Sequence, residues 1–421
     1  MNNYIKRLVE HDIEKTSNTF PVVLICGPRQ VGKTTVLEKI KFQLGNNINY
    51  VSLDDPMDRK LAKEDPSLFL EKYESPLIID EIQYATELLP YIKINVDKQR
   101  LLSFEKENIK SNGLYYLTGS QMFSMMKNVS ESLAGRVGII DMYGLSYSEI
   151  IGKEQKYFLP TFENIKEKEE NKRVNINELF DIIVKGSFPK LYQNKEIIPE
   201  KFYSGYVRTY LERDIRDMIT IKDEMKFLTF MSAVAARVGQ ELNLSNIAKD
   251  VAIDNKTAES WLSILKTSGL VYLLQPYSNN VTTRIIKAPK LYFTDTGLAC
   301  YLMGYSDGKT LEKSAVNGHI FENYVIMEIV KSFVNDNKDP RLYLSYYRDN
   351  NKKEIDLIIN INNTVYPIEI KKTKSPNKSM IKNFDVLENT STVIGEGAVI
   401  CMIEKILPLD NKNNAVPLQC I

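Results

Sequence analysis

The sequence predicts an α/β protein of several domains, and its first half predicts a parallel sheet covered by helices. At 421 residues the chain is longer than one hydrophobic core usually supports. Short apolar runs at 21–26, 49–53 and 76–81 each precede a helical stretch. This alternation is typical of parallel strands that are joined by helices.

The composition is that of an ordinary globular protein, with 43% hydrophobic and 26% charged residues. A net charge of +1 gives no general attraction to nucleic acid, although it leaves a local basic groove open. No segment has the apolar length of a membrane span, and the start lacks the apolar core of a signal peptide. We therefore expect a cytoplasmic protein without a membrane partner. Two histidines and four scattered cysteines leave little material for a zinc site.

The most informative segment is 27–34, Gly-Pro-Arg-Gln-Val-Gly-Lys-Thr, which completes the phosphate-binding pattern G-x4-G-K-[ST]. It lies between an apolar strand-like run and a helical stretch, as a P-loop must. Lys33 would neutralise β and γ phosphate oxygens, and the Thr34 hydroxyl would ligate magnesium, so ATP and Mg²⁺ are the expected cofactors. The expected nucleotide contacts in this loop are Gly27, Pro28, Arg29, Gln30, Val31, Gly32, Lys33, Thr34 and Thr35.

A second apolar run ends in two carboxylates. A helical stretch to about residue 73 leads to Pro-Leu-Ile-Ile-Asp-Glu at 76–81, about fifty residues after the P-loop. This is the Walker B form, in which Asp80 holds magnesium and Glu81 polarises the water that attacks the γ-phosphate. We therefore expect Lys33 and Glu81 to be catalytic, and Thr34 and Asp80 to hold the metal.

Several motifs together resemble one family. They are Gly-Pro-Arg-Gln-Val-Gly-Lys-Thr-Thr at 27–35, Ile-Ile-Asp-Glu-Ile-Gln at 78–83, Leu-Thr-Gly-Ser-Gln at 117–121, Leu-Ala-Gly-Arg at 133–136 and Gly-Leu-Ser-Tyr-Ser-Glu-Ile at 144–150. The set resembles the prokaryotic ATPases of the AAA type (AAA+ superfamily) that carry a C-terminal domain of unknown function. The resemblance covers nearly the whole chain and implies a Rossmann-like P-loop domain, but it supplies no defined substrate.

The resemblance also implies a polar sensor residue at the end of the strand 113–121. Thr118, Ser120 and Gln121 are all candidates, and we assign Ser120 to the nucleotide contacts. Arg136, just before the apolar run 137–142, is a candidate for an arginine that stabilises the transferred phosphoryl charge. A structural salt bridge is the alternative for Arg136.

We expect four regions: an ATPase domain at 1–151, a connector and helical segment at 152–223, a winged-helix domain at 224–294 and an α/β domain at 295–421. The crowding of Lys, Glu and Asn at 163–172 favours a solvated connector.

The winged-helix expectation rests on two helical stretches, 244–251 and 256–268, followed by a strand at 270–274 and a return through 284–286 and 291–293. Direct DNA reading by the second helix is one interpretation. That helix offers only Lys256 and Lys266 against Glu259, so a lid or protein contact is the other.

The last region places a helix, 317–333, before three strands at 342–347, 353–359 and 365–371. Asp356 with the Glu-x-Lys of the third strand resembles the restriction-endonuclease-like nuclease core. That resemblance implies magnesium on Asp356 and Glu369, water activation by Lys371 and assistance from Glu322. The alternatives are an inherited fold without cleavage, or polar residues on an exposed strand face.

We therefore expect Mg²⁺-dependent ATP hydrolysis that drives or gates a winged-helix and nuclease-like module acting on DNA. The rival is an ATP-gated protein-binding switch or scaffold with little turnover and no nuclease activity. ATP or ADP is the expected ligand in both cases, the partner is DNA or a protein, and assembly into an oligomer stays open.

Overall fold

The computed structural model describes residues 4–44, 48–106, 109–119, 129, 131–169, 178–210, 224–277, 287–389 and 392–421. The chain forms two compact units, one comprising Met1–Leu145 with Thr267–Gly269 and the other Ser146–Lys266 with Leu270–Ile421. No helix within the described ranges is long and apolar enough to cross a bilayer.

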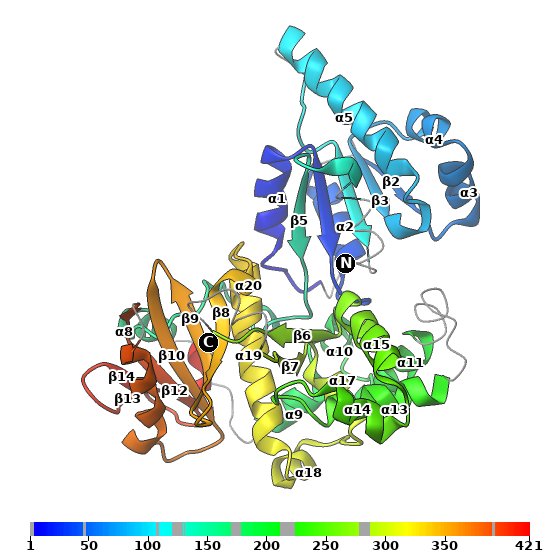
Figure 1. The fold of residues 1–421 in the computed structure, drawn as a ribbon. Coiled ribbons are helices and arrows are strands. Elements are labelled where there is room, and N and C mark those ends of the chain that lie inside the picture. The colour runs from blue at the N-terminus through cyan, green and yellow to red at the C-terminus, as the bar shows by residue number, and fades with distance from the viewer. Residues whose placement is uncertain are drawn as a thin grey trace. The chain divides into compact units, whose positions relative to one another are not determined.

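In the first unit, five parallel strands form one sheet in the order β2-β3-β4-β1-β5 (Figure 1). Their bounds are β1 (Val22–Cys26), β2 (Asn49–Ser52), β3 (Leu77–Asp80), β4 (Tyr115–Gly119) and β5 (Val137–Asp141). Because all five run the same way, their carboxyl ends meet at one edge of the sheet. β4 separates the strand that leads into the P-loop from the strand that ends in Asp80.

Helices cover this sheet. They are α1 (Glu10–Thr19), α2 (Lys33–Leu44), α3 (Pro56–Glu64), α4 (Pro66–Lys72), the 3₁₀ turn η1 (Ile82–Ala85) and α5 (Leu88–Glu105). The single stretch expected up to residue 73 is two helices, because Pro66 has no N–H to continue α3 and the Asp65 side chain caps α4 through the Leu68 N–H at 3.0 Å. The core between sheet and helices is fully apolar, with Leu24, Ile79 and Leu117 packed in one cluster with Leu88 and Ile92 of α5.

The second unit begins with short helices. They are α7 (Tyr147–Ile150), α8 (Phe162–Glu169), α9 (Leu179–Lys185), α10 (Pro189–Gln193), α11 (Pro199–Tyr210) and α13 (Glu224–Ala235). The segment read from the sequence as a solvated connector contains the fully buried side chains Phe158 and Ile165. The Phe158 N–H donates to the Ser332 hydroxyl at 3.1 Å, and α8 packs against the C-terminal strands. This segment is therefore part of the second unit's core.

The two helical stretches expected at 244–268 are α14 (Leu244–Val251) and α15 (Asn255–Thr267). They are followed by the antiparallel pair β6 (Val271–Leu274) and β7 (Lys290–Phe293). The Asn243 side chain caps α14, and Ala252 ends it in the left-handed conformation. The expected wing residues 284–286 lie outside the described residues.

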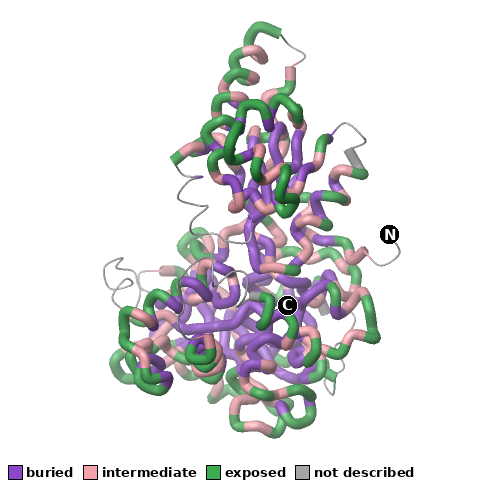
Figure 2. Tube along the Cα trace, turned by 90° about the vertical axis from the view of Figure 1, so that its right-hand side faces the viewer, coloured by how far each residue is buried: buried purple, intermediate pink, exposed green. Residues whose placement is uncertain are grey.

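A long buried helix lies at the centre of the second unit's packing. α19 (Asn317–Asn335) follows α17 (Thr296–Leu302) and α18 (Gly308–Lys313), and contacts α9, β7 and β10. Figure 2 shows how much of this unit is buried, and nearly every residue of α19 from Ile320 to Val334 belongs to that interior. A helix this apolar on all sides must be surrounded by other elements.

The C-terminal sheet has seven strands, in the order β13-β14-β12-β10-β9-β8 with β11 beside β10. The remaining elements are α20 (Pro340–Tyr343), β8 (Leu344–Arg348), β9 (Glu354–Ile361), β10 (Thr364–Lys371), η3 (Lys378–Asn389), β11 (Val393–Ile394), β12 (Gly397–Cys401), β13 (Leu407–Pro408), β14 (Asn413–Pro417) and η4 (Leu418–Cys420). β8, β9 and β10 form an antiparallel meander, whereas β12 and β14 run parallel to β10. The one-helix, three-strand order expected from the sequence is observed.

Candidate functional site

The first candidate site lies at the carboxyl edge of the five-stranded sheet, where β1 ends in the P-loop. Gly27 has φ +149°, and a Cβ at this position would overlap the carbonyl oxygen of Met142, so only glycine fits. Gly32 has φ 96°, and α2 begins at Lys33. The loop therefore ends with backbone N–H groups at a helix start, which is the arrangement that attracts phosphate.

Lys33 is folded onto its own loop. Its ammonium donates to the carbonyl oxygens of Gly27 and Pro28, both at 2.8 Å, and the residue is only 6% exposed. Burial lowers the pKa of Lys33 from its ordinary value, while the nearby Glu81 opposes this shift. In this conformation the lysine stabilises the loop, and it must leave these carbonyls to reach a phosphate.

Asp80, at the end of β3, collects three hydroxyl groups. Thr34 Oγ1 lies 3.0 Å from both of its carboxylate oxygens, and the Tyr50 hydroxyl donates at 3.3 Å. The Thr118 hydroxyl, from the end of β4, also donates to Asp80. The strand order explains this meeting, because β4 lies next to β3 and its polar end reaches the same edge.

Thr34 and Asp80 fit a magnesium ion bound together with a nucleotide. Magnesium in such sites takes one or two protein oxygens and completes its shell with phosphate oxygens and water. The Thr34 hydroxyl and the Asp80 carboxylate supply such oxygens from adjoining elements, within hydrogen-bond distance of each other.

Glu81 is held from two sides. Its backbone adopts the left-handed conformation at φ 58°, and its N–H donates to Thr118 Oγ1 at 3.0 Å. The Gln83 side-chain amide donates to the Glu81 carboxylate. Of the three sensor candidates, Thr118 thus joins the carboxylates, whereas Ser120 and Gln121 lie outside the described residues.

Two arginines, one before the P-loop and one within it, differ in what they contact. Arg7, which the sequence analysis did not single out, is 3% exposed and donates to the carbonyl oxygens of Val31 at 2.7 Å and Tyr143 at 2.8 Å. It therefore holds the P-loop backbone to the segment after β5. Arg29, an expected nucleotide contact, donates to the Tyr84 hydroxyl at 3.3 Å.

Arg136 lies at the other edge of the sheet. Its carbonyl accepts the N–H of Val22 at the start of β1, and its guanidinium forms two hydrogen bonds with Asp97, at 2.7 and 3.0 Å. The P-loop follows the opposite end of β1. The structure therefore does not bring Arg136 to Lys33 or Asp80 of the same chain.

The second candidate site lies in the second unit, between α19 and the C-terminal meander, and brings Glu322, Asp356, Glu369 and Lys371 together. Lys371 is 3.0 Å from Asp356 and 2.6 Å from Glu369. Asp356 also accepts the Ile370 N–H at 2.9 Å. Burial raises the pKa of Glu369, and the neighbouring Asp356 adds to this shift.

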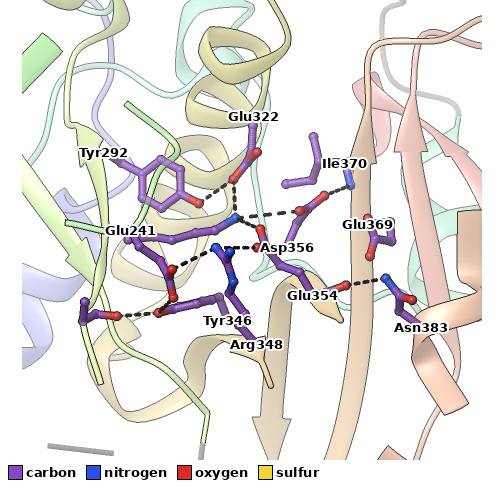
Figure 3. Close-up of polar contacts among 12 residues, drawn as sticks. Glu241, Tyr292, Glu322, Tyr346, Arg348, Glu354, Asp356, Glu369, Ile370 and Asn383 are labelled. Carbon is purple, nitrogen blue, oxygen red and sulfur yellow. Dashed lines mark hydrogen bonds and ion pairs between the residues drawn. The ribbon is translucent and has the colours of Figure 1, made fainter. Parts of the chain in front are cut away.

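A residue that sequence reasoning missed lies among these carboxylates. Lys290, at the start of β7, is 2% exposed, and its ammonium is 2.6 Å from Glu354, 3.1 Å from Glu322 and 3.8 Å from Asp356. Figure 3 shows Glu322 from the helix and Glu354 and Asp356 from the strand with their carboxylates pointing toward one another. Burial alone would lower the pKa of Lys290, but the surrounding acidic groups raise it well above its ordinary value.

A divalent metal does not fit this arrangement. Both Asp356 oxygens face ammonium groups, and Glu322 Oε1 accepts from Lys290 and from the Tyr292 hydroxyl, at 2.7 Å. Magnesium needs carboxylate lone pairs that no other cation occupies. Across the described ranges, no group of three or more His, Cys, Asp or Glu side chains is arranged to hold a metal.

Family models match three parts of the chain. Residues 19–151 match an AAA domain, residues 176–309 match a Domain of unknown function (DUF8612), and residues 317–421 match a Domain of unknown function (DUF4143). The first match spans the P-loop, Asp80 and Thr118. The first unit is accordingly an AAA-type P-loop ATPase domain.

Two similar proteins are each described as an uncharacterized protein. One from Mycobacterium tuberculosis is 26% identical over 363 residues, which cover 85% of this chain and 72% of that protein. One from Haemophilus influenzae is 24% identical over 348 residues, which cover 78% of each. Among solved structures, the Walker-type ATPase of Pyrococcus abyssi is 15% identical, with a TM-score of 0.42, over 71% of this chain and 96% of that one.

Proposed function

We propose that the protein hydrolyses ATP in a magnesium-dependent reaction at the carboxyl edge of its five-stranded sheet. The main support is that the Thr118 hydroxyl joins Asp80 to the Glu81 N–H and that Thr34 also contacts Asp80. Lys33, the residue before Thr34, lies on the P-loop itself. These residues supply the separate needs of phosphoryl transfer, namely a cation for the phosphates, oxygens for a metal and a base that orients water.

Each side chain has a distinct task in this proposal. Lys33 moves from the Gly27 and Pro28 carbonyls to the β and γ phosphate oxygens, and the backbone N–H groups at the start of α2 hold the phosphates. Glu81 accepts a proton from the attacking water. Thr34 and Asp80 hold magnesium, which when bound neutralises charge on the phosphate oxygens.

The experiment that tests the proposal measures ATP hydrolysis by the purified full-length protein with magnesium. We expect turnover by the unaltered protein, loss of nucleotide binding in Lys33→Ala, and retained binding without turnover in Glu81→Gln. Arg136→Ala is a control, because that side chain pairs with Asp97 at the opposite edge. Full hydrolysis by both Lys33→Ala and Glu81→Gln would contradict the assignment.

We further propose that ATP turnover gates the second unit, whose partner is a protein. The support is the charge of α15, whose exposed Lys256 and Lys266 are offset by the exposed Glu259. Phosphate neutralisation along DNA requires several basic groups on one surface, and each adds to the salt dependence of binding. Strong stimulation of hydrolysis by single- or double-stranded DNA would reverse this choice.

One observation favours the rival function, an ATP-gated switch with slow turnover. The Gln83 amide donates to the Glu81 carboxylate, so the proposed base already has a hydrogen-bond partner in the protein. A switch of this kind would bind ATP tightly and hydrolyse it slowly. Steady-state turnover, compared with the rate of nucleotide release, separates the two functions.

A further inference from the structure

The sequence motif of the carboxylate cluster in the C-terminal sheet predicts a metal site, but the position of Lys290 argues for a different interpretation. A helix followed by a meander with Asp356, Glu369 and Lys371 implies a metal-dependent centre. In this chain the ammonium of Lys290, from another part of the sequence, lies 3.8 Å from Asp356 and 3.1 Å from Glu322, two of the carboxylates expected in that centre. Lys290 belongs to the region 176–309, whereas the carboxylates belong to the region 317–421.

The backbone that carries Lys290 is fixed on both sides. β7 pairs with β6, where Lys290 is opposite Leu274. On the other side the Asn323 side chain accepts the Phe293 N–H at 2.7 Å and donates to the Phe293 carbonyl at 2.9 Å. Asn323 is completely buried. The backbone at Lys290 is therefore fixed by the β6 pairing and by the two Asn323–Phe293 hydrogen bonds, which lie three residues further along β7.

The side chain of Lys290 is also enclosed. Its ammonium donates to Glu322 at 3.1 Å, on the same oxygen that accepts the Tyr292 hydroxyl, and it lies 5.7 Å from the ring centre of Tyr346. Glu354, the third acidic partner, also pairs with Arg348 at 3.4 Å. A buried ammonium is stable only with such compensation, because removing it from water is costly.

We propose that Lys290 is a built-in cation that takes the place of a divalent metal in this cluster. The ammonium ties the region 176–309 to the C-terminal sheet and keeps the centre without metal and without nuclease activity. A single charge with directed N–H groups satisfies Glu322, Glu354 and Asp356 at hydrogen-bond and ion-pair distances, which are longer than the metal–oxygen distances of magnesium. This inference does not depend on ATP hydrolysis by the first unit.

The test is Mn²⁺ binding to the nucleotide-free full-length protein, measured by electron paramagnetic resonance. We compare the unaltered protein with Asp356→Asn, Lys290→Met and the double variant. Expected results are equal binding by the unaltered protein and Asp356→Asn, and one added Mn²⁺ per chain in Lys290→Met, because the competing ammonium is gone. The double variant should lose that ion. All four proteins share the P-loop, so the differences isolate the cluster.

Lys331→Met is the matched control. Lys331 is equally buried and pairs with Glu328 at 2.9 Å, on the same helix as Glu322 but outside the cluster. Its removal should add no Mn²⁺ site. A folded Lys290→Met protein without an added site would overturn the proposal.

The unaltered protein provides a second test that holds even if Lys290→Met does not fold. A Mn²⁺ site, or Mg²⁺-dependent DNA cleavage, that is present in the unaltered protein and lost in Asp356→Asn would overturn the proposal. Equal Mn²⁺ binding by these two proteins, with the DNA left intact, would support it.

Discussion

The Thr118 hydroxyl donates to the Asp80 carboxylate and accepts the backbone N–H of Glu81 at 3.0 Å, so one side chain joins both acidic residues of the proposed ATP site. Thr118 is completely buried at the end of β4, between β1 and β3. This hydroxyl therefore fixes Asp80 and Glu81 relative to each other.

We expect Thr118→Val, which keeps the shape but removes the hydroxyl, to lower kcat by about tenfold or more while nucleotide binding changes little. Glu81 would lose the partner of its N–H, and the protein should lose about 1–3 kcal/mol of stability. Steady-state hydrolysis and binding of a fluorescent nucleotide measure both effects. Thr118→Ser, which retains a hydroxyl, should stay near the original rate. An unchanged kcat in Thr118→Val would show that this contact does not serve turnover.

Gln83 restrains the same glutamate by a different contact. Because its amide donates to the Glu81 carboxylate, we expect Gln83→Leu to raise basal kcat several-fold with little change in KM. Hydrolysis at saturating ATP checks this. A lower kcat would instead mean that the amide orients Glu81 for reaction.

We expect the substitution of Asn323 to lower the stability of the protein strongly. Its side chain satisfies both the N–H and the carbonyl of Phe293 in a fully buried place, so Asn323→Leu should cost about 2–4 kcal/mol. Asn335 is the matched control, because its buried amide nitrogen has no hydrogen-bond partner in the described part of the chain. Asn335→Leu should therefore cost little. Urea unfolding of both variants gives the comparison, and similar losses would contradict the role of Asn323.

Because Lys168 is buried, we expect the stability of the folded protein to depend on pH. This lysine donates to the Lys156 carbonyl at 3.1 Å, and burial lowers its pKa from 10.5 to about 8. Between these values the unfolded chain holds a proton that the folded chain has lost, so this residue makes stability rise with pH. Below pH 8 both states are protonated, and the full cost of the buried ammonium remains.

Lys168→Met should accordingly raise the midpoint of thermal unfolding at pH 7 and do so much less at pH 10. Lys166→Met, at an exposed position of the same helix, should shift it little at either pH. An equal gain from Lys168→Met at both pH values would mean that Lys168 is not a buried ammonium.

Local sequence patterns predicted the first unit well. The P-loop, the strand ending in Asp80 and Glu81, and the helix after Lys33 follow from neighbouring residues alone, because each needs only a strand, a turn and a helix start in succession. Thr118 could be named only as one of three candidates, since which polar group reaches Asp80 depends on the register between β3 and β4.

The sequence analysis missed residues whose roles depend on contacts with residues far away in the sequence. Lys290 lies 32 positions from Glu322 and reads in sequence as one lysine among many. Arg7 lies 24 positions before Val31 and has no motif around it. A basic residue within an apolar strand, such as Lys290 before Leu-Tyr-Phe, was the one available signal.

The Lys290 ion pairs also affect whether this chain can be cut into stable fragments. A cut between residues 309 and 317 would follow the family boundaries, yet it would leave an ammonium without partners in one fragment and acidic groups without their lysine in the other. Breaking a buried pair costs about 3–5 kcal/mol. Each region should therefore be less stable when produced alone than it is in the intact chain.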